Sequence, residues 1–444
     1  MNIRAGLRFP ALALAAVSCA AVGWAAEPEG ERTLVVTAAA LIDGVSATPR
    51  ANVAVVIRGE RIVAVRDRDA ADLPAGAEHV DLGGATLLPG LIDTHTHMFL
   101  QGEVPAEGGY DVQLLRQPLA FRAARAVAAM RRALEQGFTT LRDLGTEGAG
   151  YGDVGIRQAI EAGYIPGPRL FIATLAISTT GGYPLEDYAP EVTLPKGVQI
   201  VDGPVEARKA ARTQIDHGAD WVKVYMTHRS WVDAAGNLGT QPTLTVEELR
   251  AIVDETHGWG RKVACHAYNG IGLQRALDGG CDSIEHGLEI SDAQIAQMVK
   301  QGTWYVPTIA VYYRDQDPAD TATGQRDRKR VAVHGVSFRK ALRAGVKIAF
   351  GTDIGGLPWN EPIAQEFGRE VEFGMTPMQA IQSATGRAAE LLGQQGRIGV
   401  VAPGAYADLV AVRGDPLADV GRLADVAFVM KGGRVFRLAL GAAK

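Results

Sequence analysis

The stretch 86–97, with the sequence TLLPGLIDTHTH, places a His-x-His pair directly after an apolar run. A β-strand points residues i and i+2 to the same face, so His95 and His97 would project together. If this strand begins a barrel of parallel strands, both imidazoles lie at its C-terminal mouth, where such barrels keep their catalytic residues. Paired neutral imidazoles are good ligands for zinc-like ions. The alternative for this stretch is a turn with two solvated histidines.

The chain beyond this stretch alternates short apolar runs with helix-like segments, which is the pattern of a parallel βα fold. Counting the His-x-His strand, eight strands are expected, and this number favours an α/β fold of the closed (β/α)8 TIM-like barrel type. The seven other expected strands are FTTLRDL (138–144), RLFIATL (169–175), WVKVYM (221–226), KVACHAY (262–268), SIEHG (283–287), WYVPTI (304–309) and VKIAFGTD (346–353). The expected helices include 118–136, 204–217, 245–259 and 326–344, and Thr245 followed by Glu248 matches a capping box.

The two ends of the chain differ from this middle part. Short Val- and Ile-rich runs with Gly-containing turns occur near both termini, including hairpin turns at 59–61 and 432–434. This similarity predicts one small β-sandwich-like domain completed by both termini, formed by residues 26–89 plus 401–444. The barrel would then occupy residues 90–400.

Residues 1–25 have the features of a secretory signal peptide. Arg4 and Arg8 precede an apolar segment that ends at a small-x-small site, Gly23-Trp24-Ala25. The apolar segment is too short for a stable membrane span. These features predict export, with the bacterial periplasm as the expected compartment. The alternative is a lipoprotein attached through Cys19.

Charge and cysteine content limit the other possibilities. The formal net charge is −5 and no basic run stands out, so nucleic acid is not expected as a partner. Only Cys265 and Cys281 would remain in the mature chain, and two buried free thiols are favoured over a disulfide.

Six polar residues interrupt or end five of the apolar runs. Because the C-terminal ends of barrel strands meet at one mouth, these side chains should converge although they are far apart in the sequence. Four imidazoles, one carboxylate and one lysine favour a metal site. The six residues are His95, His97, Lys223, His266, His286 and Asp353.

Lys223 is unusual in this set because an ammonium group cannot bind a metal ion. Burial lowers the pKa of a lysine, and the free amine can react with carbon dioxide to form a carbamate, an anionic oxygen ligand. The alternative is an ion pair between Lys223 and a carboxylate such as Asp353.

The motifs HTH after an apolar strand, VKVY, CHA, EHG and FGTD resemble the amidohydrolase superfamily in its binuclear-metal branch. Within it, the sequence is similar to Xaa-Pro dipeptidase-like enzymes and to ochratoxin A-hydrolysing amidohydrolases. The resemblance covers nearly all of the mature chain.

The resemblance implies two divalent ions of the zinc type. His95, His97 and Asp353 would bind one ion, His266 and His286 the other, and a carbamate on Lys223 would bridge them. A hydroxide between the ions would attack the scissile carbonyl. Asp353 would be catalytic, transferring the proton to the leaving amine. The resemblance also suggests a homo-oligomer.

Other polar residues are candidates for substrate contacts. His228 and Arg229, in an expected βα loop, could bind a substrate carboxylate, with a solvated loop as the alternative. Tyr225 shares a strand face with Lys223 and would either polarise the carbonyl or pack. Tyr183 and Tyr188 lie in a long loop that could form a lid. The remaining histidines, His79, His217, His257 and His334, are expected to be solvated or structural.

These observations predict a metal-dependent hydrolase that cleaves an amide bond. The resemblance implies that the substrate is a dipeptide or an N-acyl amino acid with a free C-terminal carboxylate. By resemblance, Xaa-Pro dipeptides and ochratoxin A are the leading substrates. The alternatives are a lactonase, a cyclic amide hydrolase or deaminase on the same site, and a non-catalytic scaffold that only binds a ligand.

Overall fold

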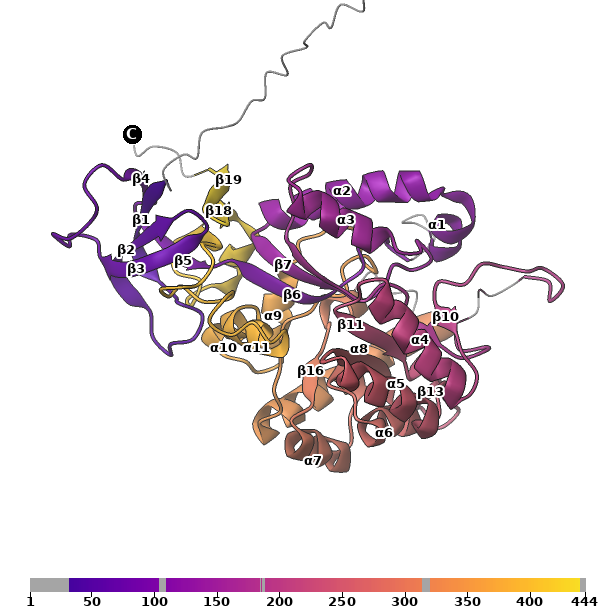
Figure 1. Ribbon diagram of the computed structural model, residues 1–444. Coiled ribbons are helices and arrows are strands. Elements are labelled where there is room, and N and C mark those ends of the chain that lie inside the picture. Colours follow the sequence, from indigo (N-terminus) through magenta and orange to yellow (C-terminus); the bar gives the residue numbers. More distant parts are fainter. Residues whose placement is uncertain (1–31, 104–108, 184, 186–187, 314–319, 440–444) are drawn as a thin grey trace, which may run out of the picture.

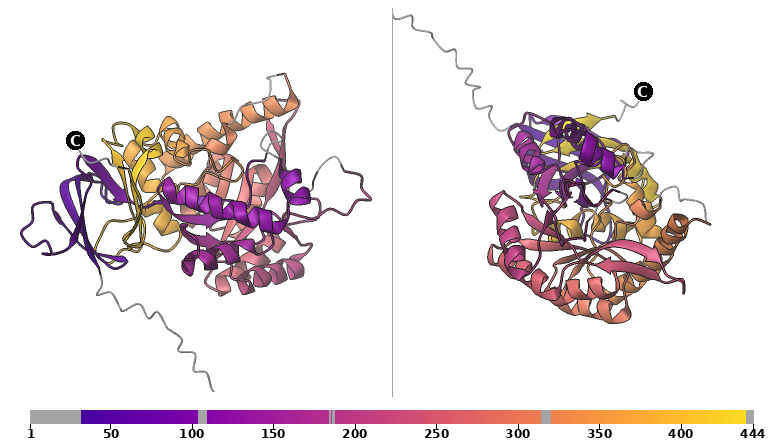
Figure 2. Two further views of the ribbon diagram at one scale, coloured as in Figure 1. Left: turned by 90° about the horizontal axis from the view of Figure 1, so that it is seen from above. Right: turned by 90° about the vertical axis from the view of Figure 1, so that its right-hand side faces the viewer.

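The computed structural model describes residues 32–103, 109–183, 185, 188–313 and 320–439. The expected signal peptide and Cys19 lie outside these described residues. In Figure 1 the described chain forms a barrel-like body with a β-sheet unit at one end, and the two further views of Figure 2 show the same division.

The terminal unit is one mixed sheet of eight strands, in the order β19-β18-β17-β5-β1-β2-β3 with β4 beside β1. The N-terminal and C-terminal strands of this sheet meet where β5 pairs antiparallel with β17, for example with Leu87 opposite Ala411. The two predicted hairpins are present as β2–β3 and β18–β19. The expectation that both termini complete one β domain is therefore confirmed. The strands are β1 (Thr33–Leu41), β2 (Arg50–Arg58), β3 (Arg61–Asp67), β4 (Glu78–Asp81), β5 (Ala85–Pro89), β17 (Leu409–Arg413), β18 (Val426–Lys431) and β19 (Arg434–Leu438).

The barrel consists of two groups of parallel strands, β6-β7-β8 and β10-β9-β11-β14-β15-β16. Every residue of β6, β7 and β11 is buried, as expected for strands covered on both faces. The strands are β6 (Leu91–Thr96), β7 (Phe138–Asp143), β8 (Arg169–Ile172), β9 (Ile177–Ser178), β10 (Gln199–Ile200), β11 (Trp221–Tyr225), β14 (Lys262–Asn269), β15 (Ser283–Glu289) and β16 (Trp304–Val306).

The expected eighth strand, 346–353, is not a regular strand, and this part of the prediction is corrected. The segment closes the barrel by changing partners along its length. Tyr305 N–H donates to Lys347 O at 2.8 Å, whereas Asp353 N–H donates to His95 O at 2.7 Å, so neither side forms a continuous ladder. Gly355 is required here because a Cβ atom at this position would lie 2.2 Å from His97 O.

The helices lie between the strands in sequence, as a βα fold requires. Three of the four predicted helices agree with the structure to within one residue at each end, and the predicted capping box at Thr245 and Glu248 is present. The fourth begins at Ala322 rather than at Arg326. The helices are α1 (Tyr110–Arg116), α2 (Leu119–Glu135), α3 (Gly152–Glu161), α4 (Pro204–Asp216), α5 (Val246–Gly258), α6 (Gly270–Gly279), α7 (Asp292–Gln301), α8 (Ala322–Ala344), α9 (Gln365–Glu372), α10 (Pro377–Ser383) and α11 (Gly386–Leu391), with 3₁₀ turns η2 (Ala310–Tyr312) and η3 (Val420–Ala424).

The segment after β11 is a hairpin, where a loop was expected. Strands β12 (Thr227–Val232) and β13 (Leu238–Pro242) pair antiparallel. Alternation along β12 places His228 on the less exposed face and Arg229 on the exposed face. The two residues that the sequence grouped together therefore point in opposite directions.

The expectation of two free thiols is also corrected, because Cys265 and Cys281 form a disulfide. Cys265 lies in β14 and Cys281 lies just before β15, the neighbouring parallel strand. The turn after α6 brings their Cα atoms to 6.1 Å, within the usual range for a disulfide. The disulfide joins the two strands that carry His266 and His286.

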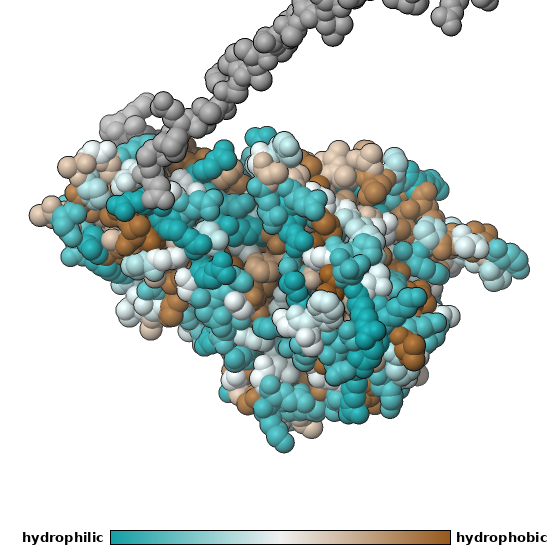
Figure 3. Space-filling view, in the orientation of Figure 1, coloured by the Kyte–Doolittle hydropathy of each residue, from teal (hydrophilic) through white to brown (hydrophobic). Residues whose placement is uncertain are grey.

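Within the described ranges, no helix combines the length and apolar character needed to cross a membrane. The face of the molecule in Figure 3 is mostly hydrophilic, with apolar residues in small separate groups.

Candidate metal centre

The six predicted metal-site residues come together at the C-terminal ends of the barrel strands. Strand β6 contributes two histidines, β11 the lysine, and β14 and β15 one histidine each, while the barrel-closing segment contributes the aspartate. The histidines and the lysine are buried, whereas the aspartate side chain is 18% exposed. These residues are His95, His97, Lys223, His266, His286 and Asp353.

The four imidazoles form a continuous cluster. The ring centroid of His95 lies 5.4 Å from that of His97 and 4.9 Å from that of His286. The centroids of His266 and His286 are 4.3 Å apart. Oδ1 of Asp353 lies 3.4 Å from Nε2 of His97 and 3.7 Å from Nε2 of His95. The sequence-predicted residues therefore share one small volume.

Three of the histidines are oriented through their Nδ1 atoms. Nδ1 of His95 is 2.8 Å from a carboxylate oxygen of Glu285, and Nδ1 of His97 is 2.9 Å from Gly145 O. Nδ1 of His286 is 2.7 Å from Oγ1 of Thr308. A partner on Nδ1 fixes the ring and leaves Nε2 available as a ligand, which is the common arrangement around protein metal sites.

The histidines are held in the neutral form. Burial, followed by the charge of Lys223, lowers the pKa of His97 to about 4. Burial also lowers the pKa values of His95, His266 and His286 well below the ordinary value. Neutral imidazole is the form that binds metal ions, so these rings are in the protonation state that a metal site requires.

Lys223 reaches into the same cluster. Its Nζ atom lies 3.2 Å from Nε2 of His95, and its side chain is fully buried. Burial lowers the pKa of Lys223 to about 8, while the nearby carboxylates of Glu285 and Asp353 oppose this effect. A much larger share of this amine is therefore uncharged near neutral pH than in an ordinary lysine, although most of it still carries a proton.

The donor set fits a divalent metal ion of the zinc type. Ligand atoms of His95, His286 and Asp353 all lie within 4.8 Å of one another. The Nε2 atoms of His266 and His286 are buried and have no hydrogen-bond partner among the described residues. A buried polar atom without a partner is costly, and a bound ion would remove this cost. The trio with mutually close ligand atoms combines residues that the resemblance assigned to two different ions.

Unusual backbone conformations mark the same strand ends. Positive φ values occur beyond the ends of barrel strands at Glu147, Thr174 and Thr308, within β15 at His286, and at Asp353 in the barrel-closing segment. Residues other than glycine rarely adopt this conformation, and it persists where the surrounding structure enforces it, often at functional sites. The backbone conformations of His286 and Asp353 are therefore enforced by tertiary contacts.

Beside the histidines lies a tyrosine–carboxylate network that sequence reasoning only partly anticipated. Glu147 is buried, and it accepts hydrogen bonds from the hydroxyl groups of Tyr110 (3.1 Å), Tyr183 (2.8 Å) and Tyr225 (3.1 Å). Its Oε1 atom lies 3.6 Å from Nδ1 of His97. Tyr225 and Tyr183 thus belong to the wall of the site. Glu147 could have been found as a polar residue just beyond a barrel strand.

A second buried hydrogen-bond network contacts the histidine cluster through His95. Arg142, on β7, donates to Glu285 at 2.9 Å and also to Thr94 O, while its guanidinium lies over the ring of Trp221. The other oxygen of Glu285 contacts His95. The EHG motif contains this glutamate, but the sequence offered no sign of its partner on β7.

The remaining predicted substrate contacts differ in position. The ring of His228 lies 4.4 Å from that of Tyr183, and burial lowers its pKa to about 4. The Nδ1 atom of His228 is buried with no hydrogen-bond partner within the described chain. Arg229 is exposed on the other face of β12, and Tyr188 is 40% exposed and bonds Asp111. His228 is therefore better placed near the site than Arg229.

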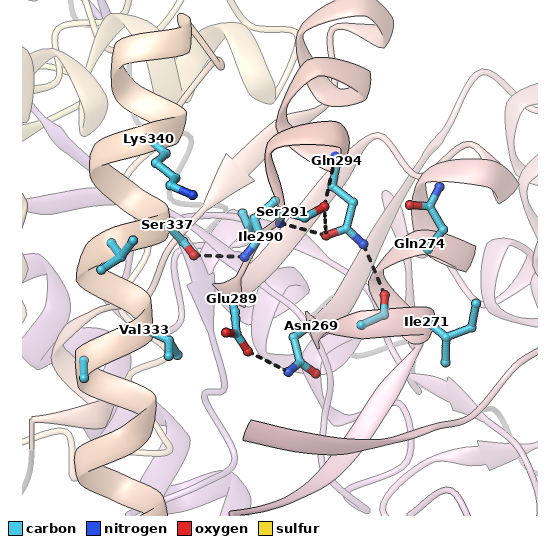
Figure 4. Close-up of a pocket in the computed structure, with 13 residues that line it drawn as sticks. Asn269, Ile271, Gln274, Glu289, Ile290, Ser291, Gln294, Val333, Ser337 and Lys340 are labelled. Carbon is cyan, nitrogen blue, oxygen red and sulfur yellow. Dashed lines mark hydrogen bonds between the residues drawn. The ribbon is translucent and has the colours of Figure 1, made fainter. Parts of the chain in front are cut away.

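A separate cavity of about 880 Å³ lies between helices α6, α7 and α8 (Figure 4). Its polar groups are engaged with the protein, as in the hydrogen bond from Asn269 to Glu289 and in that from Ile290 N–H to Ser337. Its described lining residues include no histidine or cysteine. The chemistry of the molecule is therefore assigned to the histidine cluster.

A buried His/Asp/Lys cluster at the mouth of a βα barrel defines a metal-site barrel hydrolase. The family model described as "Amidohydrolase family" matches residues 86–436, and the chain belongs to this family. The family expected from the sequence motifs is thus confirmed.

Several relatives have assigned activities. Ochratoxinase from Aspergillus niger is 32% identical over 378 residues, which cover 79% of this chain and 75% of that protein. The crystal structure of a Xaa-Pro dipeptidase with bound methionine has a TM-score of 0.81 at 32% identity, covering 91% of this chain and all of that one. A prolidase complexed with N-methylphosphonate-L-proline has a TM-score of 0.79 at 30% identity, with coverage of 91% and 100%.

Proposed function

We propose that this protein hydrolyses the amide bond of a small substrate with a free C-terminal carboxylate, either a dipeptide or an N-acyl amino acid. The observation that carries the proposal is the convergence of four neutral histidines on Asp353 and Lys223 at one barrel mouth. Relatives named Xaa-Pro dipeptidase and ochratoxinase support this substrate class.

The proposal includes two divalent ions of the zinc type. When bound, such ions polarise a carbonyl group and lower the pKa of water to about 7. The amine of Lys223, with its pKa lowered to about 8, is suited to react with carbon dioxide and become an anionic ligand. The proposed holders are His95, His97 and Asp353 for one ion, His266 and His286 for the other, and carboxylated Lys223 between them.

The side chains of the protein supply orientation and proton transfer. Asp353 would accept a proton from the attacking water and pass it to the leaving nitrogen, since an amine is a poor leaving group until it is protonated. Its 18% exposed side chain keeps it open to a substrate. Burial and the charge of Glu147 raise the pKa of Tyr225 well above its usual value, so this hydroxyl remains a hydrogen-bond donor.

The test is product release by the metal-loaded mature protein from a small panel. The panel contains Xaa-Pro dipeptides, N-acyl-phenylalanines including ochratoxin A, and lactones of similar size, with products separated by liquid chromatography. Release of a free C-terminal amino acid supports the proposal. Turnover of lactones alone would retain the site and replace the substrate class. No turnover of any member would contradict an enzymatic role for these substrates.

Export to the periplasm is also part of the proposal. The Cys265–Cys281 disulfide supports it, because disulfides persist mainly in oxidising compartments. Mass spectrometry of the protein from a periplasmic fraction should show that residues 1–25 have been removed. A full-length mass would contradict export by cleavage.

A further inference from the structure

Arg330 on α8 contacts the aromatic residues beside the histidine cluster, and neither the sequence motifs nor the predicted substrate contacts included it. Its side chain is only 17% exposed. Its Nε atom donates to Oγ of Ser230 at 2.9 Å, and a terminal nitrogen lies 3.5 Å from a carboxylate oxygen of Asp327. The guanidinium carbon lies 5.4 Å from the ring centre of Tyr268 and 5.8 Å from that of Tyr312.

These contacts place Arg330 where three barrel strands end. Ser230 follows β11 in the β12 hairpin, Tyr268 lies near the end of β14, and Tyr312 lies in the turn after β16. The C-terminal ends of barrel strands form the catalytic face of this fold. Arg330 therefore lies on that face, although it belongs to a helix of the outer layer.

One layer of aromatic rings separates the guanidinium from the metal-site histidines. The ring of Tyr268 lies 4.5 Å from that of His266 and 5.5 Å from that of His286. The ring of Tyr312 lies 6.1 Å from that of His286. A guanidinium within about 6 Å of two ring centres is attracted to the aromatic rings, and its N–H groups point along its own plane.

The alternation of side chains along β12 gives independent evidence for the position of Arg330. Ser230 is two residues from His228, so both occupy the same face of this strand. That face carries the buried Nδ1 atom of His228, which has no hydrogen-bond partner in the described part of the chain. Arg229 lies on the opposite face. The hairpin thus presents Arg330 and His228 to the same side.

We propose that Arg330 is the specificity-determining residue that binds the free carboxylate of the substrate. This inference rests on the proposed function. A guanidinium binds a carboxylate through two parallel N–H···O bonds, a geometry that a lysine cannot reproduce. The weakly exposed setting strengthens such a pair relative to one in water. Because the carboxylate of an N-acyl amino acid is three bonds from the scissile carbonyl carbon, its anchor must lie close to the metal centre.

The competing explanation is that Arg330 only fastens α8 to the β12 hairpin. In that case its loss would lower stability and affect all substrates alike. The two explanations are separated by comparing N-acetyl-L-phenylalanine with N-acetyl-L-phenylalaninamide, which have the same scissile bond but differ in the terminal charge.

The experiment measures kcat and KM for both compounds with the metal-loaded wild-type enzyme and with Arg330→Met. We expect the wild type to prefer the acid by about 100-fold in kcat/KM. In Arg330→Met this preference should fall to within about threefold, mainly through a higher KM for the acid, while the rate with the amide stays unchanged.

The matched control is Arg326→Met. Arg326 lies on the same helix and donates to Asp327 at 3.0 Å, so its loss disturbs the same carboxylate without touching the aromatic wall. It should keep the preference for the acid within about twofold of wild type. If Arg330→Met does not fold, as judged by its melting transition and metal content, Arg330→Lys provides the same comparison with an intermediate ratio expected.

The possible outcomes distinguish a failure of the role proposed for Arg330 from a failure of the proposed function. An active wild-type enzyme whose preference for the acid survives in Arg330→Met and Arg330→Lys overturns the role of Arg330 and leaves the proposed function standing. A wild-type enzyme without preference for the acid also overturns it. A wild-type enzyme that hydrolyses neither these compounds nor the panel overturns the proposed function and this inference with it.

Discussion

The β6 histidines, His95 and His97, and the β14–β15 histidines, His266 and His286, meet in one cluster but are supported by different kinds of contact. On the β6 side, an anionic carboxylate orients His95, and that carboxylate is in turn bound by Arg142. On the β14–β15 side, a neutral hydroxyl orients His286, and a disulfide joins the two strands.

This difference suggests separate tasks for the two sides. A charged partner raises the basicity of a ligand and fixes the orientation of its ring. A covalent cross-link between adjacent strands adds stability without changing the local charge. The β6 side should therefore be sensitive to changes of charge, and the β14–β15 side to changes that loosen its strands.

The largest expected effect is at Asp353, whose Oδ1 atom contacts both β6 histidines. Asp353→Asn keeps the shape of the side chain but removes its ability to accept a proton. We expect kcat to fall by about 1000-fold or more. Steady-state kinetics with the fastest panel substrate would measure this, with metal content as the control. A near-normal kcat would contradict the role of Asp353.

The next largest effect compares the loss of the charged partner of His95 with the loss of the neutral partner of His286. Glu285→Gln removes the charged partner of His95, and Thr308→Val removes the neutral partner of His286. We expect metal affinity to fall by about 10- to 100-fold in Glu285→Gln and by less in Thr308→Val. Chelator competition measures both values. Equal losses would show that the charge of Glu285 is not what distinguishes the β6 side.

The cross-link of the β14–β15 side should contribute mainly to stability. The disulfide joins residues 16 apart, and a loop of this length corresponds to about 3 kcal/mol of unfolding free energy. Cys281→Ala should lose about this amount in urea denaturation, and a reductant should cause a similar loss in the wild type. An unchanged midpoint in both experiments would show that the cross-link does not support this side.

The smallest effect concerns His334, which packs 5.6 Å from Tyr312 behind the β14–β15 side. Burial lowers its pKa to about 3 from an ordinary 6.5. The unfolded chain therefore binds a proton that the folded chain does not, and stability falls as the pH drops from 6.5 toward 3, by about 1.4 kcal/mol per pH unit.

His334→Leu, which has a similar volume, should remove this component. Denaturation at pH 6.5, 5.5 and 4.5 should show a slope shallower than that of the wild type by about 1.4 kcal/mol per unit. Parallel slopes would mean that His334 is protonated in the folded protein, and that its surroundings are more polar than the aromatic packing indicates.

The local pattern of apolar and polar residues was sufficient to predict the strands and helices that burial and periodicity define. The run before His95 is apolar because β6 is covered on both faces, and the helix beginning after Thr245 is specified by a capping box and a clear apolar stripe. The six residues of the cluster were identifiable because each interrupts or ends such a run. These signals depend on neighbours within a few positions.

The tertiary structure alone decided the features that depend on distant partners. Segment 346–353 has the composition of a strand, but it alternates between β16 and β6 and forms no ladder. Cys265 and Cys281 gave no local sign of pairing, because their distance depends on the turn that follows α6.

The same holds for the surroundings of the metal centre. Arg142 and Glu285 are 143 residues apart, and Arg330 and Ser230 are 100 residues apart. Their contacts arise only when the barrel closes. The sequence by itself thus determined the fold class and the six polar residues of the cluster, because both follow from local periodicity and residue type. The supporting charges and the position of Arg330 were decided by packing, because an ion pair or a contact between a guanidinium and aromatic rings exists only between surfaces that folding brings together.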